Sequence, residues 1–89
     1  MDKVLGCLRA AAEATRLRLL ALCAASDMNV SDLTSILGQS QPRVSRHLKL
    51  LCNAGLLDRF HEGSKVFYRL ADGSSEEGRI AEKIIDLFP

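Results

Sequence analysis

The stretch that decides the fold reads QSQPRVSRHLKLL, from Gln39 to Leu51. Ser40 can cap a helix start, because its hydroxyl can accept a hydrogen bond from a free first-turn amide. Pro42 fits only a first helical turn, where its missing N–H costs nothing. Apolar residues then recur on one side of a helix with 3.6 residues per turn: Val44, Leu48 and Leu51. The pattern predicts a helix that buries this stripe and leaves cationic side chains in solvent.

A shorter helical pattern precedes this stretch and ends at Gly38. Asn29 fits the cap position of the shorter helix, and Asp32 follows three residues later, as in a capping box. Two helices joined by Gly38-Gln39-Ser40 form a helix-turn-helix, predicted over residues 30–54, whose second helix enters the major groove of DNA. The alternative is an ordinary helical hairpin whose charges only form a solvated surface.

The periodicity changes from helical to alternating after Gly55, which can take the left-handed conformation. Residues 57–61 and 65–70 then form two predicted strands, with Val66, Tyr68 and Leu70 on one face. Gly63 supplies a positive φ at the tip. A hairpin over about 57–70, directly after a recognition helix, is typical of a wing. The predicted fold is mainly α (α+β): a winged helix-turn-helix with about five helices and a two-stranded hairpin.

The net charge of +1 hides an asymmetry along the chain. Residues 39–70 carry six Lys and Arg against two acidic residues, whereas residues 71–89 carry two against five. The positive charge therefore gathers on the predicted recognition helix and wing, where it suits contact with phosphates. Double-stranded DNA is the expected partner.

We expect the exposed polar residues of this region to divide the work of DNA binding. An Arg fork suits guanine and a Gln amide suits adenine, so the expected base contacts are Gln41, Arg43 and Ser45. The expected phosphate contacts on the recognition helix are Ser40, Arg46 and Lys49. In the wing they are Arg59, His61 and Lys65.

Both ends of the chain predict amphipathic helices, over about residues 2–12 and 75–88, and the second of these begins with a Ser74–Glu77 capping box. A symmetric homodimer would cover their apolar faces, namely Val4, Leu5, Leu8, Ile80, Ile84, Ile85 and Phe88. The alternative is that each helix folds back on its own core. Between these ends, an almost wholly apolar helix from about Thr15, its expected cap, should lie at the centre of the core.

At 89 residues and 47% hydrophobic composition, the chain is expected to form one domain, 1–89. It has no apolar run approaching the roughly 20 residues of a membrane span and no signal-peptide pattern, so we expect a cytoplasmic protein without membrane contact. No nucleophile–base pair or cofactor loop is recognisable, which argues against an enzyme and against a cofactor. Cys23 fits the core, while Cys7 and Cys52 are expected to be inert, with sensor thiols as the alternative.

The whole pattern resembles the ArsR (ArsR/SmtB) family of bacterial winged-helix repressors. The matching motifs are EATRLRLL at 13–20, VSDL at 30–33, residues 40–51, AGLL at 54–57 and FYRL at 67–70. The resemblance covers about residues 4–88. It implies a homodimeric regulator that represses by occupying a palindromic operator and leaves when an effector, unknown here, binds.

Residues 38–52 look most like a subgroup in which the winged helix is fused to an S-adenosylmethionine-dependent methyltransferase domain, although nothing in this chain encodes such a domain. One alternative is therefore the N-terminal module of such a fusion. Another is a winged helix that binds protein, whose wing would usually be neutral or acidic. Metal-sensing members carry cysteines where this chain has Asn29 and Ser31, and the last helix lacks histidine, so we expect no metal site. His47 is expected to pack or to bond a phosphate.

Overall fold

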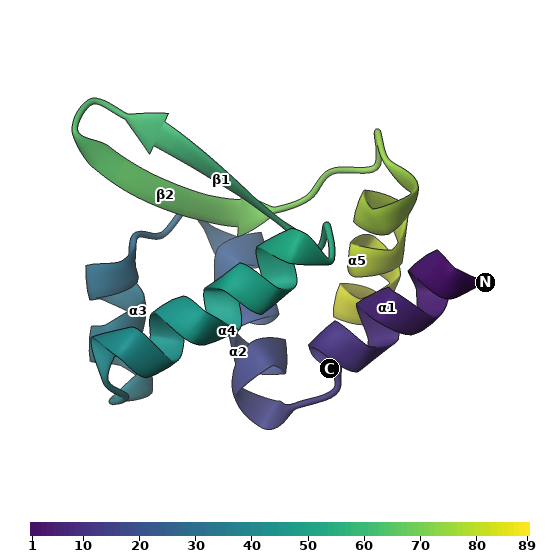
Figure 1. The fold of residues 1–89 in the computed structure, drawn as a ribbon, viewed down its shortest axis with the longest axis horizontal. Coiled ribbons are helices and arrows are strands. Elements are labelled where there is room, and N and C mark those ends of the chain that lie inside the picture. Colours follow the sequence, from purple (N-terminus) through teal and green to yellow (C-terminus); the bar gives the residue numbers. More distant parts are fainter.

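Five helices and one hairpin make up the fold, which the computed structural model describes over all residues 1–89. The elements follow in the order α1 (Asp2–Ala11), α2 (Ala14–Ala25), α3 (Val30–Leu37), α4 (Gln41–Asn53), β1 (Leu57–Glu62), β2 (Lys65–Leu70) and α5 (Glu76–Asp86) (Figure 1). This arrangement confirms the predicted winged helix-turn-helix.

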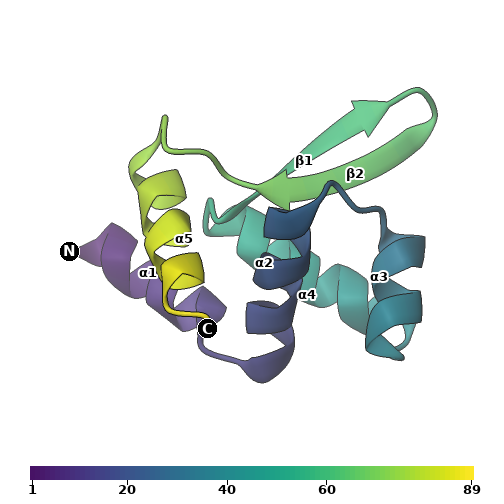
Figure 2. The same cartoon turned by 180° about the vertical axis from the view of Figure 1, so that it is seen from behind.

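Helix α2 lies at the centre of the molecule, between α5 and α3, with α4 packed behind it (Figure 2). It buries Leu19, Leu20 and Cys23 in a cluster to which every other helix and both strands also contribute. The predicted stripe of α4 faces this cluster, because Val44, Leu48 and Leu51 have no exposed surface. The recognition helix therefore turns its polar side outward.

The caps of the helix-turn-helix are formed as the sequence predicts. The Asn29 side chain accepts from the Asp32 amide, and the Asp32 side chain accepts from the Asn29 amide, which completes a capping box. Gly38 ends α3 with a φ of 66°, in the left-handed region. The Ser40 hydroxyl accepts from the Arg43 amide and so begins α4.

The wing is an antiparallel hairpin whose register runs from Leu57 opposite Leu70 to Glu62 opposite Lys65. Strand β1 is one residue longer than predicted. Gly63 makes the turn with a φ of 64°. The Tyr68 side chain is buried in the core, and its backbone exchanges two hydrogen bonds with that of Met28.

Two predicted caps are wrong, and in both cases a neighbouring residue takes the position. Glu13 caps α2, because its longer carboxylate reaches the amides of both Thr15 and Arg16. Ser75 caps α5, because the amide and hydroxyl of Ser74 both donate to the Asp72 carboxylate. Helix α5 therefore begins at Glu76, one residue later than predicted. Helix α1 ends at Ala11, one residue earlier than predicted.

Helices α1 and α5 pack against each other within the protomer (Figure 1). Lys3 joins their N-terminal turns through Glu76 and Glu77, at 3.6 and 3.8 Å. Both helices also bury residues in the shared core, so each folds back on its own core to this extent. Considerable apolar surface still faces outward, with Leu8 48% and Leu87 82% exposed. No helix has both the length and the hydrophobicity that a membrane crossing requires.

Candidate nucleic-acid interface

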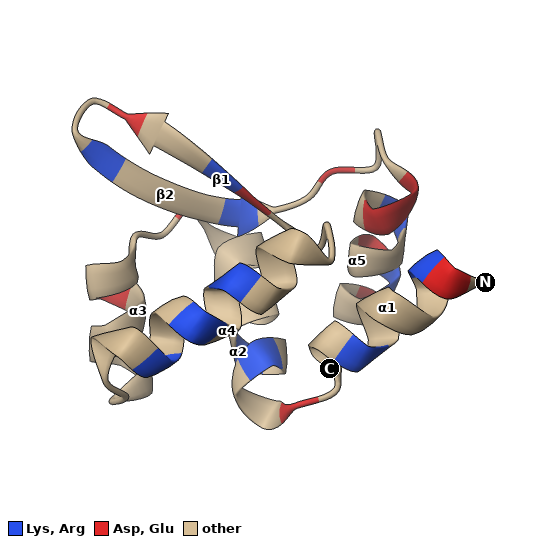
Figure 3. Cartoon of the chain, in the orientation of Figure 1, with Lys and Arg blue, Asp and Glu red and all other residues tan.

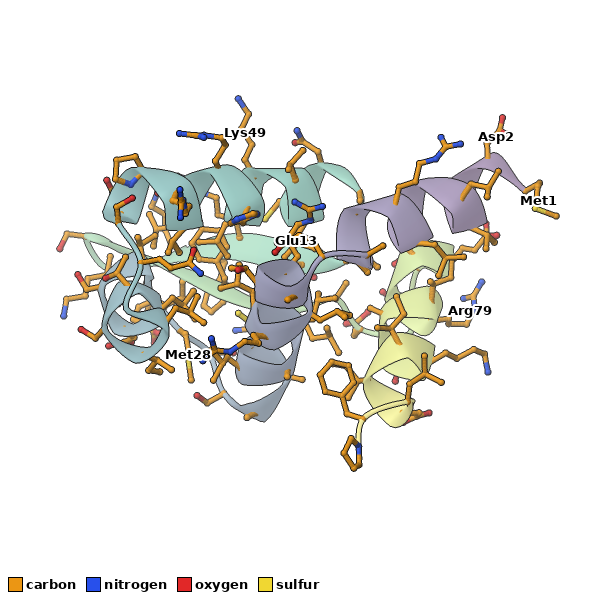
Figure 4. All side chains as sticks on the ribbon, turned by 90° about the horizontal axis from the view of Figure 1, so that it is seen from below. Met1, Asp2, Glu13, Met28, Lys49 and Arg79 are labelled. Atoms are coloured by element: carbon orange, nitrogen blue, oxygen red, sulfur yellow. The ribbon has the colours of Figure 1, made fainter.

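One side of α4 forms a row of polar and cationic side chains. Gln41, Arg43, Arg46 and Lys49 are exposed, and Ser45 is half-buried. Figure 3 shows Lys and Arg positions along α4 and on both strands of the wing, in the left half of the view. In Figure 4, Lys49 points away from the body of the protein. With a rise of about 1.5 Å per residue, the helix presents roughly 20 Å of this surface, enough to lie in a major groove.

The start of α4 brings two of the predicted base-contacting residues together. The Gln41 side-chain amide donates to the Ser45 hydroxyl over 2.9 Å, one helical turn away. The first-turn amides lie beside them, and the positive end of the helix dipole favours a phosphate there. This end of the helix therefore combines hydrogen-bonding side chains with the positive end of the helix dipole.

The cations of the predicted interface form no ion pairs within the protein. Salt bridges engage Lys3, Arg16 and Arg69, whereas the following residues have none: Arg43, Arg46, Lys49, Arg59 and Lys65. All five are exposed. Because no carboxylate neutralises them, their charge is available to a polyanion.

The wing does not bring its three predicted contacts onto one face. The register places Arg59 and His61 on the face of Tyr68, and Lys65 on the opposite face with Phe60 and Phe67. All three contacts are exposed. The alternation could have been read from the sequence, because residues of a strand alternate between faces.

Arg69 also belongs to the wing, but its side chain is already engaged. Its Nη2 atom lies 3.2 Å from Asp27 Oδ2. Its guanidinium carbon lies 3.9 Å from the centre of the Phe60 ring, which stacks on Phe67. Arg69 thus holds the outer face of the wing to the loop before α3.

A polar cluster of Glu13, Arg16 and His47 lies beneath α4. His47 Nδ1 lies 3.2 Å from Arg16 Nη1 and 3.6 Å from Glu13 Oε2. Arg16 Nη1 also lies 3.9 Å from Glu13 Oε2, within the range of an ion pair. No local signal connects these residues to His47, which lies 31 positions along the chain from Arg16.

The thiols are protected by their surroundings. Burial raises the pKa of Cys23 to about 12 and also raises the pKa of Cys7 and Cys52. Cys23 lies in the core, as predicted. No three His, Cys, Asp or Glu side chains gather in a way that could hold a metal ion.

The residues predicted for a dimer interface occupy different depths. Leu5 is 41% exposed and Leu8 48% exposed, so both offer surface. Four others are half-buried: Val4, Ile80, Ile85 and Phe88. Ile84 is only 6% exposed and packs into the protomer's own core, because it lies on the side of α5 that faces α1 and α2. Ile84 is thus the most buried of the residues predicted for the interface.

Residues 13–59 match the family model of the bacterial regulatory protein ArsR family. The arsenical resistance operon repressor of Escherichia coli is 45% identical over 76 residues, which cover 84% of this chain and 62% of that protein. The transcriptional regulator KmtR of Mycobacterium tuberculosis is 35% identical over 78 residues, which cover 88% of this chain and 56% of that protein. The chain therefore spans about three fifths of the length of these relatives.

Solved structures share the fold over nearly the whole chain. HlyU from Vibrio cholerae aligns with a TM-score of 0.81 and 31% identity, covering 98% of this chain and 92% of that one. A homodimeric winged helix-turn-helix DNA-binding domain from Mycobacterium bovis, a possible ArsR-family regulator, aligns with a TM-score of 0.83 and 26% identity, covering 97% and 75%. With this fold and these sequence matches, the chain belongs to the ArsR family of bacterial regulatory proteins.

Proposed function

We propose that the protein is a sequence-specific DNA-binding transcriptional regulator, and that it represses by occupying an operator until an effector releases it. The observation that carries this proposal is the outer side of α4, where exposed cations without ion-pair partners stand beside hydrogen-bonding groups at the helix start. Repressors among the relatives support the same function.

In this proposal the residues of the interface have distinct roles. The residues that read base edges are Gln41, Arg43 and Ser45. The residues that bind phosphates are Ser40, Arg46 and Lys49 on α4, and Arg59, His61 and Lys65 on the wing. Each good two-point contact to a base is worth roughly 1–3 kcal/mol of discrimination, whereas phosphate contacts add affinity for any sequence.

We further propose that two copies of the chain bind a palindromic operator. The partner would cover Leu5 and Leu8, which are exposed on α1, and the half-buried apolar residues at the other end of the chain, namely Ile80, Ile85 and Phe88. The homodimeric state of the Mycobacterium bovis domain supports this proposal. The two α4 helices would then enter successive major grooves about 34 Å apart.

A fluorescence-anisotropy titration tests the proposal, with DNA from the upstream region of the protein's own gene and a scrambled duplex at about 0.15 M salt, where charges interact over only about 8 Å. The Arg43→Ala, Arg46→Ala double variant should lose selective binding. The matched control is Arg18→Ala, Lys83→Ala, which removes equal charge from exposed positions of α2 and α5.

Selective binding by the wild type and the control, lost in the double variant, would support the proposal. Equal binding of both duplexes by the wild type would contradict it and favour a winged helix that binds protein.

Arg43→Ala alone should relax sequence preference, while Lys65→Ala should weaken binding to all duplexes about equally. The fusion alternative, a module that targets a methyltransferase, is tested by reading the gene beyond Pro89.

A further inference from the structure

A set of polar contacts connects the start of α2 to the recognition helix. Glu13 caps α2 by accepting from the amides of Thr15, at 2.9 Å, and Arg16, at 3.2 Å. The Arg16 side chain donates backward to the carbonyl of Ala10, in the last turn of α1. It also reaches His47, in the middle of α4, at 3.2 Å. Figure 4 shows Glu13 directly beneath α4.

Arg16 is the donor in its contact with His47. A guanidinium can only donate, so His47 Nδ1 is the acceptor. The 3.6 Å between Glu13 Oε2 and the same nitrogen is too long for a hydrogen bond. Only 17% of the Arg16 side chain and 19% of the His47 side chain are exposed. Water screens such a contact less than it screens a surface pair.

A second contact joins α2 to the turn of the helix-turn-helix. The Gln39 side-chain amide donates to the Thr15 hydroxyl over 3.0 Å. The carbonyl oxygen of the same Gln39 side chain is buried without a partner. The bond to Thr15 ties the turn before α4 to the first turn of α2.

Together with the packing of the buried stripe of α4, two polar contacts separated along the chain constrain its angle, whereas one such contact would permit rotation about itself. His47 lies six residues beyond the first residue of α4, about 9 Å along its axis. If α4 pivoted at the turn by about 10°, Ser45, about 6 Å along its axis, would move by about 1 Å. Base contacts tolerate displacements of only about 0.5 Å. The angle of α4 against α2 therefore decides whether its side chains reach the bases.

We propose that Arg16 and His47, together with the Thr15–Gln39 bond, set this angle and are positioning residues for DNA recognition that do not themselves touch DNA. The proposal rests on the proposed function of the protein. Because Arg16 also bonds the last turn of α1, one side chain connects the helix with an exposed apolar face to the helix that reads DNA. A displacement of α1 would reach α4 through Arg16.

The test compares Arg16→Ala and His47→Ala with the matched control Arg18→Ala, an exposed arginine on the same helix. Residual dipolar couplings of the DNA-free protein measure the angle between α2 and α4. We expect a change of about 10° in the first two variants and none in the control. His47→Asn should restore the wild-type angle, because its side-chain oxygen can accept from Arg16 near the position of Nδ1.

The second measurement is the ratio of dissociation constants for operator and scrambled duplexes over a range of salt concentrations. We expect Arg16→Ala and His47→Ala to lower this ratio about tenfold, equivalent to 1.4 kcal/mol. The salt slope should stay at the wild-type value, because no phosphate contact is removed. If the alanine variants do not fold, Arg16→Lys keeps the charge without the planar fork and replaces them in both measurements.

The outcomes separate the two proposals. An unchanged angle in all variants overturns the positioning role, whatever the DNA result. A reduced salt slope with an unchanged ratio overturns it as well, because His47 would then bind a phosphate directly. If the wild type shows no preference between duplexes, the proposed function fails, and the couplings alone decide whether these residues set the angle.

Discussion

The wing carries two arginines in different surroundings, and the salt dependence of DNA binding should separate them. Arg59 is exposed and has no acidic partner. Arg69 is held by Asp27 at 3.2 Å and lies over the Phe60 ring at 3.9 Å. We therefore expect Arg59 to neutralise a phosphate and Arg69 to stabilise the wing. Arg59→Ala and Arg69→Ala form a matched pair that removes the same charge from neighbouring positions.

The expected magnitude follows from the number of phosphates neutralised. Each one contributes about 0.9 to the slope of log K against log salt concentration. With two copies on the operator, Arg59→Ala should lower the slope by about 1.8. Between 50 and 200 mM salt, the wild type should then lose about 12 times more affinity than this variant. Arg69→Ala should keep the wild-type slope.

Arg69→Ala should instead lower the stability of the fold. An exposed ion pair contributes about 0.2–1 kcal/mol, and a cation–π contact at such a site about 0.5–1 kcal/mol. Their loss should reduce the Tm by roughly 3–16 °C in a domain of this size. Anisotropy titrations at five salt concentrations and thermal melts by circular dichroism measure both quantities. Equal slopes for the two variants would refute the distinction between a free and an engaged arginine.

Three further predictions concern the fold and its titratable groups. Gly78→Ala should lower the free energy of unfolding by about 1–3 kcal/mol, because its Cβ would lie 1.5 Å from the backbone oxygen of Asp72. Gly6 has open space around it, so Gly6→Ala should raise the free energy of unfolding by about 1 kcal/mol. Urea titrations measure both, and equal effects would contradict the packing described. The hydrogen bond from the Thr15 amide lowers the pKa of Glu13. The stability that Glu13 contributes is therefore present above its unfolded pKa of about 4.3 and is lost as pH falls through the folded pKa. Glu13→Gln should make the Tm fall less steeply between neutral and acidic pH, and an unchanged pH dependence of the Tm would contradict this. Because burial raises the pKa of Cys23 to about 12, iodoacetamide at pH near 8 should label it far more slowly in the folded than in the unfolded protein, and rapid labelling of the folded protein would exclude that burial.

The helix-turn-helix was predictable because its signals are local. The bond from the Arg43 amide to Ser40 and the left-handed φ of Gly38 involve residues close in sequence. The buried stripe of α4 follows from its period alone. Gly63 likewise determined the hairpin turn and hence the register. For these features, the residue type and its spacing already contain the physical cause.

The rest depends on how the helices cross, which periodicity does not encode. A stripe of apolar residues shows that a face is buried, but not against which element. Ile84 is covered by the protomer itself, whereas Leu8 on α1 is not. The Arg16–His47 contact joins two helices across 31 positions and exists only because α2 passes beneath α4. The choice of Glu13 over Thr15 as a cap also depends on reach, which residue preferences do not describe.

The arrangement of the elements gives α2 a role that its apolar sequence does not suggest. The proposed DNA-binding surface lies on α4 and the wing, and exposed apolar residues lie on α1 and just after α5. Helix α2 packs between these two parts, and at its start Arg16 bonds both α1 and α4. In a dimer built on α1 and α5, the position of each reading helix relative to its partner would depend on this junction. A ligand that displaced either terminal helix could therefore change operator affinity without touching the DNA-binding residues.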